Sequence, residues 1–138
     1  MSDAVFRGLG PGDVRGIADS YVETYSKEPW NEEWDPEVAL HKVEDLVTGS
    51  TALCYGAFQD GGFVGGLFGR RNYYKKDKEL FVDEFFVDRR LQRRGYGTRI
   101  LAFATGDLAA KGYSCIVLNT ERGFPSERFY LANGFRTL

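Results

Sequence analysis

The sequence predicts an α/β domain in which a mixed β-sheet carries helices on its faces. Apolar segments typical of strands and helices follow one another along the 138 residues in the order β-α-α-β-β-β-α-β-α-β. The central strands are consecutive, and Asp60-Gly61 between the first two of them is a strong hairpin signal. No linker, repeat or low-complexity stretch interrupts the pattern. We therefore expect residues 1–138 to form a single domain.

The N-terminal third of the chain predicts a short strand at 4–9 and two helices. Pro11-Gly12-Asp13 opens the first helix, and the second begins at Asp35-Pro36-Glu37, which supplies an N-cap, a first-turn proline and an acidic residue. His41 lies off the apolar stripe of the second helix, so we expect it to be solvated. The apolar stripe of the first helix consists of Val14, Ile17, Ala18, Tyr21 and Tyr25.

The rest of the chain predicts four more strands and two more helices. Strands are expected at 51–58, 63–74 and 79–88, and the glycines between 61 and 69 indicate strand curvature or close ligand approach. They do not form a phosphate loop, because no helix begins behind them. Segment 113–119 is apolar nearly throughout, as in a strand buried on both faces. A helix at 125–133 and a final strand at 135–138 complete the pattern.

The composition excludes several classes of protein. With 18 Lys and Arg against 20 Asp and Glu, the net charge of -2 gives no reason to expect nucleic-acid binding. Cys54 and Cys115 are widely separated in apolar segments, which favours two reduced, buried thiols over a disulfide or a metal site. The N-terminus does not resemble a signal peptide, and no segment has the length of a membrane span. We expect a soluble, cytoplasmic protein without a metal ion.

Positive charge and glycine are concentrated between the strand at 79–88 and the next helix, which spans about 99–110. A helix start leaves backbone N–H groups unpaired, and a start with small residues binds anions. Gly95 and Gly97 allow close approach, while Arg93, Arg94 and Arg99 add charge. The third glycine of a dinucleotide loop and the Gly-Lys-Ser/Thr of a P-loop are absent. The residues suit a pyrophosphate, although solvated arginines at an ordinary helix start would give the same composition.

Four segments resemble the GNAT family of N-acetyltransferases. Gln92–Gly97 is similar to the Q/R-x-x-G-x-G/A signature, and Arg128–Phe135 is similar to F-Y-x-x-x-G-F on the last helix of the family. The segments "EPWNEEW" and "VDEFFVD" resemble the branch similar to aminoglycoside 6'-N-acetyltransferases. The resemblance spans nearly the whole chain. It implies a mostly antiparallel sheet with one splayed parallel strand pair, helices on both faces, and acetyl-CoA as co-substrate.

The resemblance assigns cofactor roles to residues of this chain. It implies that the backbones of Phe86 and Val87 contact the pantetheine arm. The pyrophosphate loop would comprise Gln92, Arg93, Arg94, Gly95, Tyr96, Gly97 and Thr98. Gly123 stands where the family often carries an asparagine, which puts one CoA contact in doubt. The sequence stops at Leu138 where relatives usually continue into another strand, so we expect a short sheet or a homodimer that covers its edge.

Acetyl transfer to an amine requires a base, because a free alkyl amine is protonated at neutral pH. The resemblance places that base at Glu84, three residues before Val87. Asp83 is the reserve candidate and would face the opposite side of a regular strand. Tyr130 falls at the position of the family's general acid, near the departing sulfur. Both Glu84 and Tyr130 have ordinary structural alternatives, a surface ion pair and a core tyrosine.

Trp30, Asn31 and Trp34 lie, with several glutamates, in the loop that forms part of the acceptor site in this family. Aromatic faces and carboxylates suit a cationic amine, although the tryptophans would equally serve to fix the loop to the core. We therefore expect an acetyl-CoA-dependent N-acetyltransferase that acts directly on a primary amine of a small cationic molecule. The alternatives are a CoA-binding module without turnover, and a protein lysine or N-terminal acetyltransferase.

Overall fold

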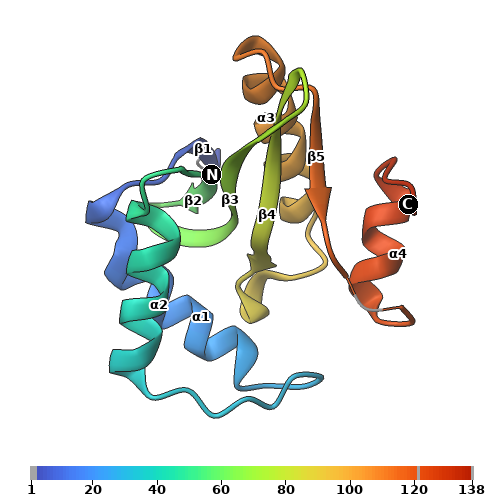
Figure 1. The fold of residues 1–138 in the computed structure, drawn as a ribbon. Coiled ribbons are helices and arrows are strands. Elements are labelled where there is room, and N and C mark those ends of the chain that lie inside the picture. Colours follow the sequence, from blue (N-terminus) through green and yellow to red (C-terminus); the bar gives the residue numbers. More distant parts are fainter. Residues whose placement is uncertain (1–2, 121, 138) are drawn as a thin grey trace.

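The computed structural model describes residues 3–120 and 122–137, which form one mixed sheet with helices on both faces (Figure 1). The five strands lie in the order β1-β2-β3-β4-β5. In chain order the elements are β1 (Val5–Gly8), the 3-10 turn η1 (Pro11–Asp13), α1 (Val14–Tyr25), α2 (Pro36–Thr48), β2 (Ala52–Gln59), β3 (Gly62–Tyr74), β4 (Asp77–Val87), the 3-10 turn η2 (Arg89–Leu91), α3 (Tyr96–Ala110), β5 (Cys115–Leu118) and α4 (Pro125–Ala132). None of the helices in these residues combines the length and apolar character needed to cross a membrane.

The sheet is antiparallel from β1 to β4 and parallel between β4 and β5, so the predicted mixed architecture is confirmed. β5 was expected to be buried on both faces, and this is wrong: it is a four-residue edge strand whose side chains are half-buried or exposed. For the same reason Cys115 is exposed, whereas Cys54 is buried as predicted. Residues 135–137 form no strand, and Leu138 lies outside the described residues.

Two apolar layers lie on opposite faces of the sheet. On one face, Leu67 and Leu80 pack in a cluster with Ile100 of α3. On the other face, Ile17 of α1 and Val43 of α2 pack in a separate cluster with central strand residues. α4 lies beyond β5 and follows it in the chain (Figure 1). The central strands are therefore covered on both sides, as the predicted α/β class requires.

β4 contains one extra residue relative to β3. Phe68 pairs with Glu84, but the next residue of β3, Gly69, pairs with Val82. Asp83 therefore has no counterpart, which defines a β-bulge in the middle of β4. A bulge bends the strand and changes the side of the sheet that the following side chains face.

The bulge reverses the direction of side chains along β4. Before it, Leu80 and Val82 pack in the cluster on the α3 side. After it, Glu84 contacts α1 and Phe86 packs in the cluster with α1 and α2. A regular strand would keep all even-numbered side chains on one face. The extra residue therefore turns Glu84 toward α1 and away from α3.

The glycines of β3 are explained by close packing within the protein. A Cβ atom on Gly65 would lie 2.8 Å from the carbonyl oxygen of Phe86, and one on Gly69 would lie 2.7 Å from the side chain of Leu80. Both distances are shorter than ordinary van der Waals contacts. Gly69 also lies next to the bulge. The sequence offered two explanations for these glycines, strand curvature and the close approach of a ligand. Strand curvature fits Gly69. At Gly65 the group that approaches closely is the neighbouring strand β4.

Candidate active site

β4 has an open edge beyond its pairing with β5. The parallel pairing ends at Val82, while β4 continues to Val87. The N–H of Asp88 donates to the carbonyl of Val64 in β3, with an N···O distance of 2.7 Å. Because backbone groups alternate along a strand, Phe86 also directs its peptide groups to β3, and Val87 directs them to the open edge. Of the two backbones predicted to contact pantetheine, Val87 lies on the accessible side and Phe86 does not.

A loop with two left-handed residues connects this open edge to α3. Arg93 has φ of 66° and Gly95, the residue before the helix, has φ of 83°. No side chain caps the start of α3 within the described residues, so the N–H groups of Tyr96, Gly97 and Thr98 are available, as at any uncapped helix start. Successive N–H groups with left-handed residues form a concave anion site.

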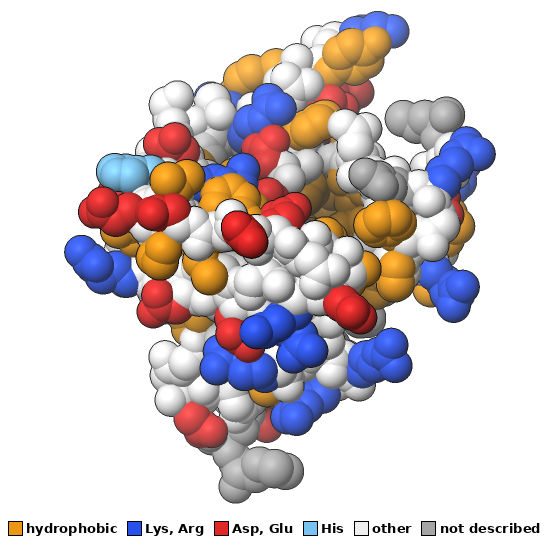
Figure 2. Space-filling view, turned by 90° about the horizontal axis from the view of Figure 1, so that it is seen from below, with side chains coloured by type: hydrophobic (Ala, Val, Ile, Leu, Met, Phe, Trp, Pro, Cys, Tyr) orange, Lys and Arg blue, Asp and Glu red, His pale blue; other side chains and the backbone are white. Residues whose placement is uncertain are grey.

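The surroundings of this loop are positively charged. The side chains of Arg93 and Arg94 are exposed and have no carboxylate partner in residues 3–120 and 122–137. Figure 2 shows a group of basic side chains in the lower half of the face seen from below. Arg99, in the first turn of α3, instead lies over the ring of Phe6, 4.9 Å from its centre. The loop therefore has unpaired N–H groups and two uncompensated guanidinium groups, which an anion would neutralise.

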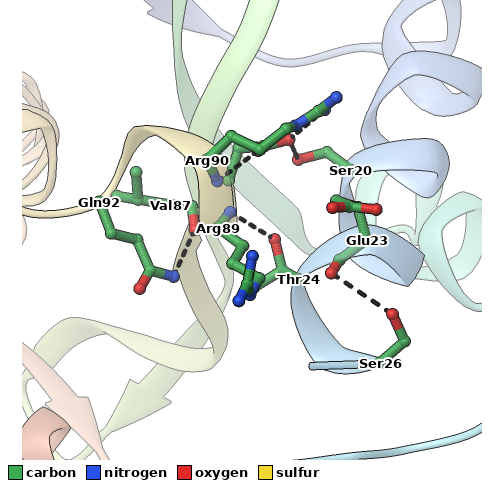
Figure 3. A network of polar contacts seen from close by, with 9 residues as sticks. Ser20, Glu23, Thr24, Ser26, Val87, Arg89, Arg90 and Gln92 are labelled. Carbon is green, nitrogen blue, oxygen red and sulfur yellow. Dashed lines mark hydrogen bonds and ion pairs between the residues drawn. The ribbon is translucent and has the colours of Figure 1, made fainter. Parts of the chain in front are cut away.

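A buried carboxylate fixes the start of the loop. Asp88 is 1% exposed and accepts hydrogen bonds from the Ser20 hydroxyl at 2.6 Å and from Arg90, both from its N–H at 3.0 Å and from its guanidinium at 2.9 Å. Next to it, the Arg89 N–H donates to the Thr24 hydroxyl at 3.0 Å, and the Gln92 side chain donates to the Val87 carbonyl at 3.0 Å (Figure 3). Burial opposes ionisation of Asp88, but the donors and the charge of Arg90 hold its pKa below the ordinary value.

Glu84 lies on the α1 side of β4 and is held by two phenol groups. The hydroxyl of Tyr21 donates to one carboxylate oxygen at 3.1 Å, and that of Tyr25 donates to the other at 3.4 Å. The ammonium of Lys42 on α2 lies 3.7 Å from the first oxygen. The Glu84 side chain is 20% exposed. The carboxylate is thus accessible to a small group but mostly removed from water.

Burial raises the pKa of Glu84 above its usual range. The charge of Lys42 and the hydrogen bonds from Tyr21 and Tyr25 oppose this shift, and the nearby Glu32 adds to it. The net increase shows that the donors do not fully replace the lost hydration. A carboxylate with a raised pKa accepts a proton more readily, which suits a general base.

The reserve candidate, Asp83, was expected to face the opposite side of the sheet, and this is wrong. Because of the bulge, it lies on the same face as Glu84, beside a depression of about 450 Å³ that residues of α2 also line. Its carboxylate forms an ion pair with Arg70 at 3.2 Å. Asp83 is therefore engaged by a cation of the protein, whereas the donors within hydrogen-bond distance of Glu84 in the described part of the chain are neutral.

Tyr130 of α4 lies in an aromatic cluster at the open edge of β4. Its ring packs against Phe85 at 6.0 Å, Phe129 at 5.4 Å and Phe135 at 5.4 Å between centres. Burial, followed by the charge of Glu84, raises the pKa of Tyr130 to about 12. The phenol is therefore protonated at neutral pH and close enough to Glu84 to respond to its charge. Gly123, which precedes this helix, has φ of 84°.

The predicted acceptor loop packs against the same two tyrosines that hold Glu84. Trp34 lies edge-on to Tyr21 at 5.1 Å between ring centres, and Trp30 lies edge-on to Tyr25 at 5.0 Å. The Trp34 indole also donates to Glu32 at 2.7 Å. The tryptophans therefore do fix the loop to α1. A depression of about 630 Å³ beside them is lined by residues that include Asn31, Glu32, Glu33, Trp34 and Asp35.

The sequence did not single out Tyr21, Tyr25, Lys42 or Asp88 as parts of the site. The two tyrosines were assigned to the apolar stripe of α1, and they are part of the aromatic packing around Phe86. Their hydroxyl groups at i and i+4 were the one signal available, since such a pair projects from one face of a helix. No group of three or more His, Cys, Asp or Glu side chains in the described part of the chain is arranged to hold a metal ion.

A mixed sheet whose parallel strand pair separates in front of an open, glycine-containing helix start is the architecture of an N-acetyltransferase domain, and the comparisons agree. Residues 14–135 match the Acetyltransferase (GNAT) family. The chain belongs to this family. Among curated proteins, none is similar enough to count as a match.

Solved structures share this fold at low sequence identity. Aminoglycoside N-acetyltransferase AAC(6')-Iy in complex with CoA is 16% identical, with a TM-score of 0.77 over 99% of this chain and 90% of that chain. An aminoglycoside acetyltransferase from an uncultured soil metagenomic sample is 17% identical, with a TM-score of 0.74 over 99% and 94%. An integron cassette protein from the mobile metagenome of V. cholerae is 9% identical, with a TM-score of 0.84 over 100% and 88%.

The raised pKa of Glu84 predicts a particular pH dependence of stability. A group whose pKa is raised by folding contributes stability that is present below its ordinary pKa and is lost as the pH rises through the folded value. The unfolding free energy of the wild type relative to Glu84→Gln should therefore fall as the pH rises above about 4, the ordinary pKa of a glutamate. Urea unfolding at a series of pH values measures this difference. Tyr21→Phe, which removes a donor to the carboxylate, should make the fall larger, and a flat difference would contradict the assigned environment.

Proposed function

We propose that this protein is an acetyl-CoA-dependent N-acetyltransferase that transfers the acetyl group directly to a primary amine of a small cationic molecule. One observation supports this more than any other. Glu84, a mostly buried carboxylate with a raised pKa, lies on the strand that ends in the anion-binding loop. A proton acceptor and a site for a pyrophosphate are thus placed along one strand edge, which is the arrangement that amine acetylation requires.

The cofactor would bind along the open edge of β4. Its pyrophosphate would accept hydrogen bonds from the N–H groups of Arg94 to Thr98, with the guanidinium groups of Arg93 and Arg94 nearby. Its pantetheine arm would follow β4 and contact the backbone groups that face the open edge, which belong to Phe85 and Val87. Since a strand rises about 3.3 Å per residue, Glu84 lies about 10 Å along the strand from Val87. The thioester would therefore reach the level of Glu84.

The proposed reaction has one proton acceptor and one proton donor. The Glu84 carboxylate takes a proton from the ammonium, and the free amine attacks the thioester carbonyl. The N–C bond forms, the nitrogen loses its second proton to solvent, and the C–S bond breaks. The thiolate leaves with the proton of the Tyr130 hydroxyl, and solvent then restores the proton of Tyr130 and takes the one held by Glu84. Lys42 lies 3.7 Å from Glu84 and favours its ionised form, which is the form that accepts a proton.

Direct transfer fits better than an acyl-enzyme intermediate. Burial raises the pKa of the Cys54 thiol to about 11, which suppresses the thiolate that a nucleophile needs. Cys115 is exposed, and its pKa is also raised, by burial and by the charge of Glu79. His41 is exposed on α2 and bonds to neither thiol. The residues around Glu84 therefore serve to bring the amine and the thioester together.

The acceptor would enter beside the loop that carries Trp30 and Trp34. The depression next to Trp34 has three carboxylates on its lining, from Glu32, Glu33 and Asp35. Their negative charge would attract an ammonium group, and Glu32 also acts electrostatically on Glu84. Structural relatives of this chain include one solved with sisomicin and one solved with a bisubstrate analogue of CoA and an acetylneamine. A polycationic amine is the acceptor that these observations favour.

CoA should bind to the wild-type protein, and Arg93→Ala/Arg94→Ala should weaken binding by on the order of tenfold, because two exposed ionic contacts are lost. Isothermal titration calorimetry at two salt concentrations measures both the affinity and its salt dependence, which should decrease in the variant. Arg15→Ala, which removes an exposed charge on α1, is the matched control and should leave both unchanged. Absence of CoA binding to the wild type would refute the proposed function.

Glu84→Gln should lower kcat at pH 7 by about 10²- to 10⁴-fold, the usual contribution of a general base. Raising the pH should restore part of the rate, because solvent then deprotonates more of the amine. Tyr130→Phe should lower kcat and leave the Kd of CoA unchanged, since it removes only the proton donor. Full activity of Glu84→Gln at pH 7 together with inactivity of Asp83→Asn would assign the base to Asp83 instead.

A matched panel of primary amines tests the acceptor class. Diamines, polyamines and amino sugars should give higher kcat/KM than neutral hydrophobic amines, and Glu32→Gln/Glu33→Gln should reduce this preference selectively. A lysine peptide and a peptide with a free N-terminus belong in the same panel. Higher kcat/KM for the peptides would replace the small-molecule assignment, and binding of CoA without turnover of any amine would favour a binding module.

A further inference from the structure

α1 contacts β4 at two separate levels through two rows of side chains. Ser20 and Thr24 form one row, and Tyr21 and Tyr25 form the adjacent row. Residues four apart lie one above the other on a helix, so each row presents two side chains in the same direction. The two rows contact different parts of β4, the first at its end and the second at Glu84.

The serine and threonine row holds the first peptide groups after β4. Ser20 and Thr24 are both buried, at 4% and 0% exposure. Ser20 donates to the Asp88 carboxylate at 2.6 Å, and Thr24 accepts from the Arg89 N–H at 3.0 Å. Asp88 in turn caps the turn η2 by accepting from the Arg90 N–H at 3.0 Å. The position from which the cofactor loop starts is therefore set by α1.

The tyrosine row holds the carboxylate of Glu84 through one hydroxyl on each oxygen. Both rings pack edge-on against Phe86, at 5.6 Å for Tyr21 and 5.7 Å for Tyr25. Phe86 lies in sequence between Glu84, which the tyrosine row contacts, and Asp88, which the serine and threonine row contacts. The spacing between the base and the loop is thus fixed by contacts to one rigid helix.

We propose that α1 positions both reaction partners, with Ser20 and Thr24 holding the loop that binds the acyl donor and Tyr21 and Tyr25 holding the base. This inference rests on the proposed function. It assigns four positioning residues, none of which touches the reacting atoms itself. Because the rows act at different levels, their loss should have different kinetic signatures, whereas a merely structural helix would give one uniform effect.

Loss of the serine and threonine row should affect the donor through its pyrophosphate. Ser20→Ala and Thr24→Val should each lower kcat/KM for acetyl-CoA by about tenfold, the effect of one buried hydrogen bond. S-acetylpantetheine carries the same thioester without the pyrophosphate. Its kcat/KM should change much less, so the preference for acetyl-CoA over S-acetylpantetheine should fall. Thr24→Ser keeps the hydroxyl and should restore the preference.

Loss of the tyrosine row should affect the ionisation of the base. Groups that face Glu84 are the two phenols of α1, Lys42 of α2, Glu32 of the acceptor loop and Tyr130 of α4. Tyr21→Phe and Tyr25→Phe remove donors that favour the carboxylate, so the acid limb of the kcat/KM profile should move to higher pH. The preference between the two acyl donors should stay unchanged in these variants.

Two controls remove hydroxyl groups that contact only their own helix. Ser26→Ala loses a contact to the Glu23 carbonyl at the end of α1, and Thr48→Val loses one to the Glu44 carbonyl in α2. Neither should change the donor preference or the acid limb. Urea unfolding of every variant separates these effects from a loss of folded protein.

Two results would overturn the inference. The first is an equal fall in kcat/KM for both donors in Ser20→Ala and Thr24→Val, and the second is an unchanged acid limb in both tyrosine variants. Failure of the proposed function itself would be visible earlier, because the wild type would then bind no CoA or acetylate no amine. If the wild type acetylates amines normally and the four α1 variants differ from it only in stability, the positioning role is contradicted and the proposed function is not.

Discussion

The extra residue in β4 at Asp83 is the constraint on which the site depends. Without it, Glu84 would stay on the side of Leu80 and Val82 and would face the apolar cluster under α3. A carboxylate in that environment would lack donors and would be strongly disfavoured. With the bulge, Glu84 meets two phenols and an ammonium on the α1 side, and Phe86 fills the core beside it. One backbone irregularity therefore makes a mostly buried carboxylate compatible with a stable sheet.

Glu84 in β4 and Asp88 just after its end show how nearby hydrogen-bond donors decide whether a buried carboxylate is ionised. Asp88 accepts from a hydroxyl, a peptide N–H and a guanidinium at 2.6–3.0 Å, and its pKa is lowered although it is 1% exposed. Glu84 accepts only from two neutral phenols at 3.1 and 3.4 Å, with Lys42 at 3.7 Å, and its pKa is raised. Charge-assisted bonds are the stronger kind. Asp88 is therefore a fixed structural anion, whereas Glu84 retains the capacity to take a proton.

The sequence was sufficient for those features that depend on local patterns. The Asp60-Gly61 hairpin, the Asp35-capped start of α2 and the glycine-containing start of α3 are all determined by neighbouring residues. The bulge was not predictable, because the sequence of β4 has no regular alternation that an extra residue would interrupt, and the shift arises from pairing with β3. The hydrophobic run at 113–119 likewise predicts a central strand, yet β5 lies at an edge of the sheet. The contact of Tyr21 and Tyr25 with Glu84 was hidden because an amphipathic side chain packs in the core and presents its hydroxyl to a polar group at once.

The two halves of the proposed site differ in how far they depend on side-chain identity. The donor half relies on backbone groups, namely the N–H groups that open α3 and the exposed peptide edge of β4. Such groups follow from the fold, and the fold is shared with structures that are 9–18% identical to this chain. The acceptor half relies on the tryptophans and carboxylates of the loop between α1 and α2. Because these contacts are made by individual side chains, the acceptor of a relative does not determine the acceptor of this protein, and the loop must be tested on its own chemistry.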